Sequence, residues 1–120
     1  MSGNQFPNHP VLQKLRRLSA TLPESCEIET WEHPTFRAGK KIYAIFGDHE
    51  GTAAVSIKQT LAQQPAWLAK KGFYAPPYVA HKGWVGIRVE QVDWPTIAKL
   101  AIDGYRQVAL KRMLKQLDDA

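Results

Sequence analysis

The chain has 120 residues, of which 44% are hydrophobic and 22% charged, as in ordinary soluble globular proteins rather than disordered ones. Its length fits one domain, expected over residues 1–120, with one hydrophobic core. A single cysteine excludes an intrachain disulfide, and the sequence shows neither a signal peptide nor an apolar run of about 18 residues, so we expect a cytoplasmic protein without a membrane partner. The formal net charge of +5 favours polyanionic partners such as nucleic acid.

The first predicted element is a helix that begins at Pro10. Asn8 and His9 supply a polar cap, and proline is tolerated in the first turn because its missing N–H has no partner there anyway. Apolar residues then recur at spacings of four and three: Val11, Leu15, Leu18 and Leu22. This pattern predicts one apolar helical face that ends near Pro23.

Between residues 26 and 58 the hydrophobic period changes to two, which predicts strands. In residues 26–30 the pattern places Cys26 and Ile28 on a buried face, opposite Glu27 and Glu29. Residues 31–34 are expected to leave that strand. Residues 41–46 and 52–58 predict a hairpin whose polar turn, residues 47–51, has glycine at both ends.

The second half predicts two more helices around a fourth strand. Residues 60–71 form an amphipathic pattern that Gly72 ends, and the proline-rich segment 73–78 is unsuited to a central strand. Alternation over residues 84–90 predicts the fourth strand, and Asp93 caps a last helix that continues or kinks toward residue 117. We therefore expect an α+β fold: an antiparallel sheet of about four or more strands with helices packed on one side.

No catalytic or metal-binding motif is assembled along the chain. His9, His33, His49 and His81 are far apart and no cysteine pair accompanies them, which argues against zinc. Cys26 is expected to be a buried structural thiol rather than a nucleophile. We expect neither an enzyme nor a cofactor, although residues distant in sequence can still meet in space.

Two segments combine aromatic and cationic side chains just before a predicted strand, namely residues 31–44 and residues 75–85. Cations beside aromatic rings can contact phosphates while the rings stack on bases. The alternative is that these aromatic side chains fill the core and the cations form ordinary surface.

The same segments carry a family likeness. The patterns W-x-H-P-x-F-R-x-x-x-K-I-Y-A, P-x-Y-x-x-x-x-G-W-V and D-W-x-x-I, followed by a helix over residues 104–112, resemble the MmcQ/YjbR family of small bacterial proteins. The likeness covers residues 10–117. It implies a double-wing α+β fold similar to the DNA-binding domain of a phage transcription factor, and hence a DNA-binding function in which the sheet and its flanking segments form the wings.

Two functional hypotheses follow. The first is a non-catalytic protein that contacts the phosphate backbone of nucleic acid, DNA rather than RNA, through Arg37, Lys40, Lys41, Lys82, Trp84 and Arg88. The second is a protein-interaction or small-ligand module with a concave apolar site lined by Trp31, His33, Phe36, Tyr78 and His81, to which Trp84 could contribute. The sequence leaves the oligomeric state open, with a monomer as the default expectation.

Overall fold

One antiparallel sheet organises the computed structural model, which describes residues 5–119, so the expected span 1–120 extends past them at both ends. The six strands are β1 (Ser25–Thr30), β2 (His33–Ala38), β3 (Lys41–His49), β4 (Thr52–Ile57), β5 (Phe73–Tyr74) and β6 (Val85–Arg88). Their spatial order is β1-β2-β3-β4-β6-β5. The predicted α+β class with an antiparallel sheet is confirmed.

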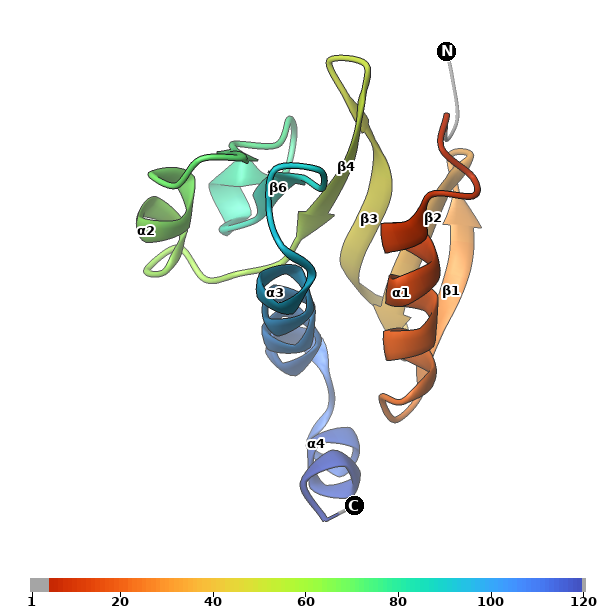
Figure 1. Cartoon of the computed structure of the whole chain (residues 1–120). Coiled ribbons are helices and arrows are strands. Elements are labelled where there is room, and N and C mark those ends of the chain that lie inside the picture. The colour runs from red at the N-terminus through yellow and green to blue at the C-terminus, as the bar shows by residue number, and fades with distance from the viewer. Residues whose placement is uncertain (1–4, 120) are drawn as a thin grey trace.

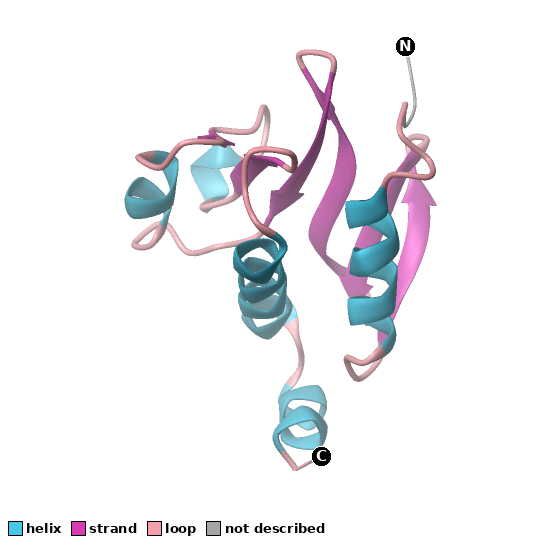
Figure 2. Cartoon of the chain, in the orientation of Figure 1, coloured by secondary structure: helices cyan, strands magenta, loops and turns pink. Residues whose placement is uncertain are grey.

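The two longest helices, α1 (Pro10–Ala20) and α3 (Trp94–Val108), pack on the same face of this sheet (Figures 1 and 2). A short helix α2 (Gln64–Leu68) and the 3-10 turn η1 (Ala80–Lys82) lie at the β5–β6 side. Helix α4 (Lys111–Asp118) follows α3 and extends beyond the lower end of the sheet (Figure 1). No helix of the described residues covers the opposite face of strands β1 to β4.

The caps of α1 and α3 form as predicted. The His9 ring accepts a hydrogen bond at Nδ1 from the Val11 N–H, and the Asp93 carboxylate accepts one from the Thr96 N–H. The core lies between these helices and the sheet. It contains Leu12, Leu15, Phe36, Ala44, Phe46, Val55, Ile57, Ile87, Ile97, Leu100, Ala101 and Tyr105.

A strand was missed at residues 33–38, and its hairpin explains why. Thr30 pairs with His33, so Trp31 and Glu32 form a two-residue turn with φ of 51° and 64°. This turn has positive φ at both central residues, as type I′ hairpin turns require, but lacks the Asn-Gly or Asp-Gly signature by which sequence reveals it. Pro34 is tolerated in β2 because pairing with β3 starts only at Thr35.

The predicted burial of Cys26 is wrong, because the helices cover the other face of β1. Ser25 and Glu27 point toward α1: Ser25 Oγ lies 2.7 Å from Ser19 Oγ, and Glu27 receives two hydrogen bonds from Arg16. Cys26 and Ile28 are exposed on the helix-free face. Arg16 extends from α1 over β1 and binds Glu27. The face of β1 that carries the glutamates is therefore the one that α1 covers.

Two helical boundaries also differ from expectation. Instead of a helix over residues 60–71, only Gln64–Leu68 is helical, and Pro65 stands in its first turn, where proline is tolerated. The last helical segment breaks at Ala109, whose backbone is extended (ψ 146°), so α3 and α4 are separate helices.

A candidate ligand-binding cleft on the open sheet face

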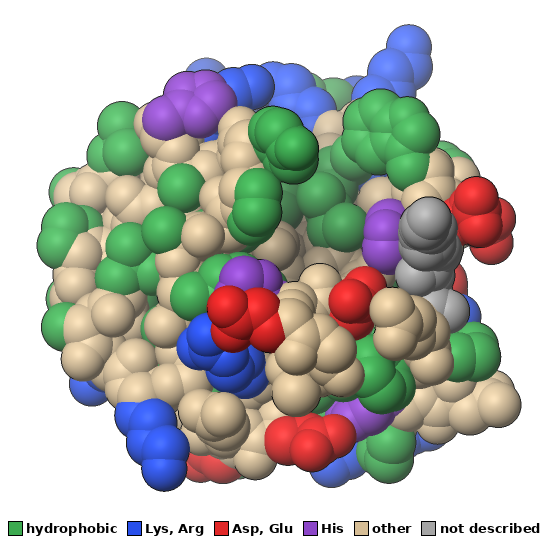
Figure 3. Space-filling model, turned by 90° about the horizontal axis from the view of Figure 1, so that it is seen from above, with side chains coloured by type: hydrophobic (Ala, Val, Ile, Leu, Met, Phe, Trp, Pro, Cys, Tyr) green, Lys and Arg blue, Asp and Glu red, His purple; other side chains and the backbone are tan. Residues whose placement is uncertain are grey.

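The helix-free face is hollowed into a cleft of about 390 Å³. Its residues come from three separated parts of the chain: residues 31–33, residues 45–56 and residues 74–79. They are Trp31, His33, Ile45, Gly47, Asp48, Ala54, Ser56, Tyr74, Pro76, Pro77, Tyr78 and Val79. From above, the molecule shows a hollow bordered by hydrophobic side chains, with histidine and acidic side chains beside it (Figure 3).

Strand register forms the floor of the cleft. Ile45 pairs with Ser56 and Gly47 pairs with Ala54, so all four residues present to the same face of the β3–β4 hairpin. Three of the four are small, and this leaves a depression in the middle of the sheet. The bulge where β2 meets β3 lets Tyr43 and Ala44 both turn toward the helices.

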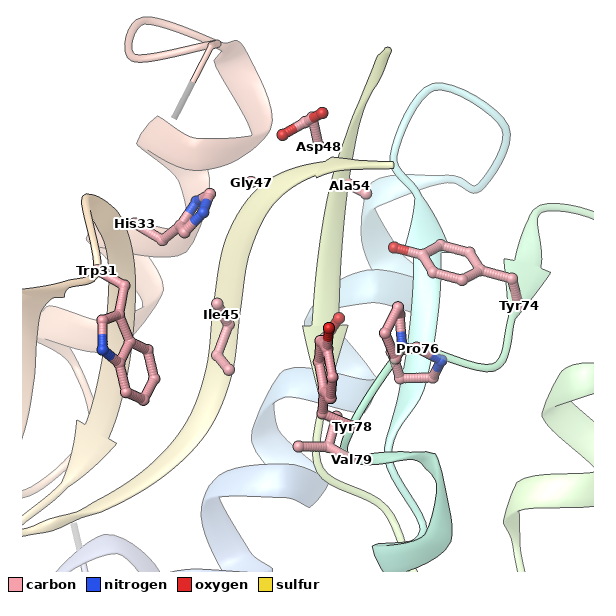
Figure 4. Close-up of a pocket in the computed structure, with 12 residues that line it drawn as sticks. Trp31, His33, Ile45, Gly47, Asp48, Ala54, Tyr74, Pro76, Tyr78 and Val79 are labelled. Carbon is pink, nitrogen blue, oxygen red and sulfur yellow. The ribbon is translucent and has the colours of Figure 1, made fainter. Parts of the chain in front are cut away.

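Two exposed aromatic rings flank this floor. Trp31 is 84% exposed and Tyr78 is 94% exposed, and they lie on opposite sides of Ile45 (Figure 4). Both residues have left-handed backbones, with φ of 51° and 70°. A bulky residue rarely adopts this conformation, so two such residues at the rims of one cleft are notable candidates for contact with a ligand.

Histidine and carboxylate groups stand at the end of the cleft near the β3–β4 turn. The His33 ring packs against Gly47, where a Cβ atom would lie 2.8 Å from Nδ1, so glycine is required there. Nδ1 is buried without a hydrogen-bond partner among the described residues. Asp48 also lines the cleft, and its Oδ2 lies 3.5 Å from Gln5 Nε2.

Tyr74 forms part of the wall and is held from both sides. Its ring stacks on His49 with centroids 3.7 Å apart, and it covers Gly86, where any Cβ would collide with the ring. The Arg88 guanidinium lies 5.1 Å from the ring centroid and pairs with Glu50 at 3.3 Å. Burial raises the pKa of the Tyr74 hydroxyl above its ordinary value, so this group stays neutral and donates or accepts hydrogen bonds.

The structure brings together three of the five residues expected to line a ligand site: Trp31, His33 and Tyr78. Phe36 is not among them, because alternation along β2 points it at the helices and it is 1% exposed. His81 is exposed on η1, outside the lining of this cleft.

The six residues expected to contact nucleic acid do not form one surface. Trp84 is 6% exposed, so its ring is not available to stack on a base. Arg37 donates to Thr30 and Thr35 on the open face, whereas Arg88 is held by Glu50.

The three lysines of this set are exposed and form no ion pair with any described residue. Lys40 and Lys41 lie at the β2–β3 turn, and Lys82 lies on η1. Arg88 lies level with Gly47 across the sheet, because both residues pair with Ala54 of β4. Lys41 is six residues from Gly47 along β3, which corresponds to about 20 Å at the rise of a strand. The predicted cations therefore occupy separate regions.

Sequence reasoning missed Asp48, which was placed in the polar turn of residues 47–51, and Tyr74, which lies in the proline-rich segment 73–78. The pairing of Ile45 with Ser56 did not follow from the predicted turn at residues 47–51, because β3 continues to His49 and only Glu50 and Gly51 form the turn. The packing of Tyr74 over Gly86 links β5 to β6 and carries no local sequence signal. Among the described residues there is no group of three or more His, Cys, Asp or Glu side chains placed to hold a metal ion, and no helix long and apolar enough to cross a membrane.

The same architecture, an α+β domain with one sheet face free of helices, occurs in solved structures of other proteins. A protein from Deinococcus radiodurans, DR2400, whose domain is described as DUF419, is 19% identical, with a TM-score of 0.72 over 89% of this chain and 87% of that one. A protein from Pseudomonas syringae is 18% identical, with a TM-score of 0.66 over 79% of this chain and 96% of that one. At these identities the likeness concerns the fold.

The family itself follows from the sequence match. The family model YjbR matches residues 20–107, which include every strand and most of α3. The chain belongs to the YjbR family. No curated protein matches it.

Proposed function

We propose that this chain is a non-catalytic binding domain that holds its ligand in the open-face cleft. The observation that carries the proposal is the pair of exposed rings, Trp31 and Tyr78, placed on left-handed backbone at opposite sides of an apolar floor. Concave, mostly apolar sites with a few polar groups are the usual form of ligand sites. Apart from His33, Asp48, Ser56 and the two tyrosines, the lining is apolar or glycine.

The absence of catalysis is part of the proposal. The family is not known as a family of enzymes. The chain of hydroxyls that links Ser19, Ser25 and Tyr43 lies beneath α1, on the other face of the sheet. No histidine or carboxylate of the described residues takes part in this hydrogen-bonded group of hydroxyls, so none is placed to act as its base.

The test is a thermal-shift screen of metabolites against the wild type and two cleft variants. Trp31→Asn and Tyr78→Asn remove the rings, and asparagine tolerates the left-handed backbone at both positions. A ligand at about 100 times its Kd stabilises the folded state by about 2.7 kcal/mol, which a melting curve resolves. We expect ligands that raise the Tm of the wild type and fail to raise that of either variant.

Leu61→Asn is the matched control, because Leu61 is an exposed apolar residue outside the cleft. It should respond to ligands like the wild type. Ligands that shift all four proteins equally would show that binding takes place elsewhere on the molecule.

Nucleic-acid binding is a second candidate, which the distribution of unpaired lysines favours. Met113 of α4 packs against Gly39 of the β2–β3 turn, so this helix and the turn share one end of the molecule. Lys40, Lys41, Lys111 and Lys115 are exposed at this end, and none forms an ion pair with a described residue. Such a cluster favours contact with phosphates independent of base sequence.

This candidate is tested by fluorescence anisotropy with labelled duplex DNA at low and at physiological salt. Contact of four or five phosphates gives a log–log salt slope of about −4. The double variant Lys40→Glu, Lys41→Glu should weaken binding for all sequences and flatten the slope, whereas Lys70→Glu, Lys71→Glu serves as the charge-matched control. Equal binding by both double variants would exclude this end of the molecule as the contact surface.

A further inference from the structure

Building on the proposed function, we infer that the cleft selects a ligand with an organic cationic head group, a quaternary ammonium or a guanidinium. Three features of the lining point to this class of ligand. At one end of the cleft the Asp48 carboxylate has no cationic partner among the described residues. Two exposed aromatic rings flank the floor, and the nearby Arg88 is already paired with Glu50.

The carboxylate is Asp48. Its one hydrogen bond within the described residues comes from the neutral amide of Gln5, at 3.5 Å, and no described cation pairs with it. The neighbouring acid Glu50, by contrast, pairs with Arg88 at 3.3 Å and lies 3.7 Å from His49 Nε2. Asp48 therefore leaves a negative charge at the cleft that no side chain in the described part of the chain offsets.

The aromatic faces are those of Trp31 and Tyr78. A cation within about 6 Å of such a ring centroid is attracted by the negative face of the ring, by about 0.5–1 kcal/mol at an exposed site. Tyr74 does not contribute a face, because His49 and Gly86 cover its two sides. It presents its hydroxyl edge instead, next to Ser56.

The titratable groups that line the cleft are His33, Asp48, Tyr74 and Tyr78. None is a permanent cation, so an anionic ligand would meet Asp48 without a compensating charge. The positive charge of the whole chain acts over longer distances and is screened beyond about 10 Å at 0.1 M salt. The nearby carboxylate and rings therefore decide the preference.

The experiment follows the indole N–H signals of the ¹⁵N-labelled protein during titration with two pairs of probes. Each pair has one cation and one neutral compound of similar shape: choline with 3,3-dimethylbutan-1-ol, and the peptide Gly-Arg-Gly with Gly-citrulline-Gly. The Trp31 signal is identified by its loss in Trp31→Asn. The signal of the buried Trp84 is the internal reference.

We expect a cationic probe to shift the Trp31 signal in a saturable way, while its neutral counterpart at the same concentration does not. Asp48→Asn should weaken this binding about fivefold or more, since it removes the charge but keeps the shape and one acceptor. Tyr78→Asn should weaken binding about as much. Binding of choline indicates a free small cation, and binding of the arginine peptide alone indicates a cation carried by a polypeptide.

Equal binding of cation and neutral counterpart, or unchanged binding in Asp48→Asn, overturns the inference while leaving the cleft as a ligand site. Failure of both cations to bind the folded wild type also overturns it. In that case the thermal-shift screen still decides the proposed function, because it includes neutral and anionic compounds.

Discussion

At the residue scale, the unusual feature is where the backbone is left-handed. Glu24, Trp31, Glu32, Glu50 and Tyr78 have positive φ among the described non-glycine residues. Glu50 belongs to the tight β3–β4 turn, where Gly51 follows it with φ 81°. Trp31 and Tyr78 are different, because each combines this backbone with a large exposed ring beside the cleft. A bulky side chain at such a position costs stability, and we propose contact with a ligand as the reason for it.

Trp31→Asn should therefore raise the free energy of unfolding, by about 1 kcal/mol, because asparagine fits the type I′ turn better and little buried surface is lost. Urea denaturation measures this change. Leu61→Asn is the reference, expected within about 0.5 kcal/mol of the wild type as an ordinary surface substitution. A loss of stability in Trp31→Asn would mean that the ring contributes to packing, and would weaken its assignment to a ligand.

At the element scale, the close packing of α3 on the sheet fixes the covered face and so leaves the other one open. Gly104 is the contact point: a Cβ there would lie 2.9 Å from the Lys58 carbonyl oxygen and 3.0 Å from Ile57 Cγ2. On the same helix the Tyr105 hydroxyl donates to the Pro23 carbonyl at 2.6 Å. Together these contacts hold α3 against β3, β4 and the loop that precedes β1.

Gly104→Ala should lower the free energy of unfolding by about 1–3 kcal/mol, the usual cost of overpacking. The sign of this change in unfolding free energy is informative. In a helix with free space at this position, alanine would instead stabilise relative to glycine by about 1 kcal/mol. Thermal or urea unfolding gives the value. Gln107→Ala, at an exposed position of the same helix, should change stability little. A stabilised Gly104→Ala protein would show that α3 lies farther from the sheet than described.

At the scale of the whole molecule, ion pairs connect the C-terminal helix to the rest of the chain. Arg112 makes two hydrogen bonds to Glu24, in the loop between α1 and β1, and Arg106 of α3 pairs with Asp118 of α4. The Arg112 guanidinium lowers the pKa of the Glu24 carboxyl, and Arg106 does the same for Asp118. Both pairs are exposed to solvent, so each contributes modestly.

These lowered pKa values predict how stability depends on pH. A carboxyl with a lower pKa in the folded state adds stability above its unfolded pKa, near 4, and loses it as the pH falls through the folded value. The urea midpoint should therefore fall between pH 5 and pH 2, and less so in Glu24→Gln, which removes one titrating group. An equal fall in both proteins would show that the Glu24–Arg112 pair adds nothing measurable in solution.

How much the sequence predicted depended on how local each signal was. Pro10 after His9, Asp93 before Trp94 and the alternation of residues 52–57 concern neighbours along the chain, and the corresponding helices and strand are confirmed. The Trp31–Glu32 turn was not predicted, since its residues carry no turn signature, and with it the strand β2 was missed. The burial of Cys26 was assigned to the wrong face because alternation gives two faces and does not say which one a helix will cover.

By itself the sequence determined the α+β class, the β3–β4 hairpin, both long helices and their caps, the likeness to the YjbR family, and three aromatic or histidine residues of the cleft. Local propensity and periodicity are sufficient for these because they act over a few residues. Only the tertiary structure decided that Trp84 and Phe36 are buried, that the cations separate, and that Trp31 and Tyr78 flank one floor with Asp48 at the end of the cleft. Those outcomes depend on packing between segments far apart in the sequence, which no local pattern encodes.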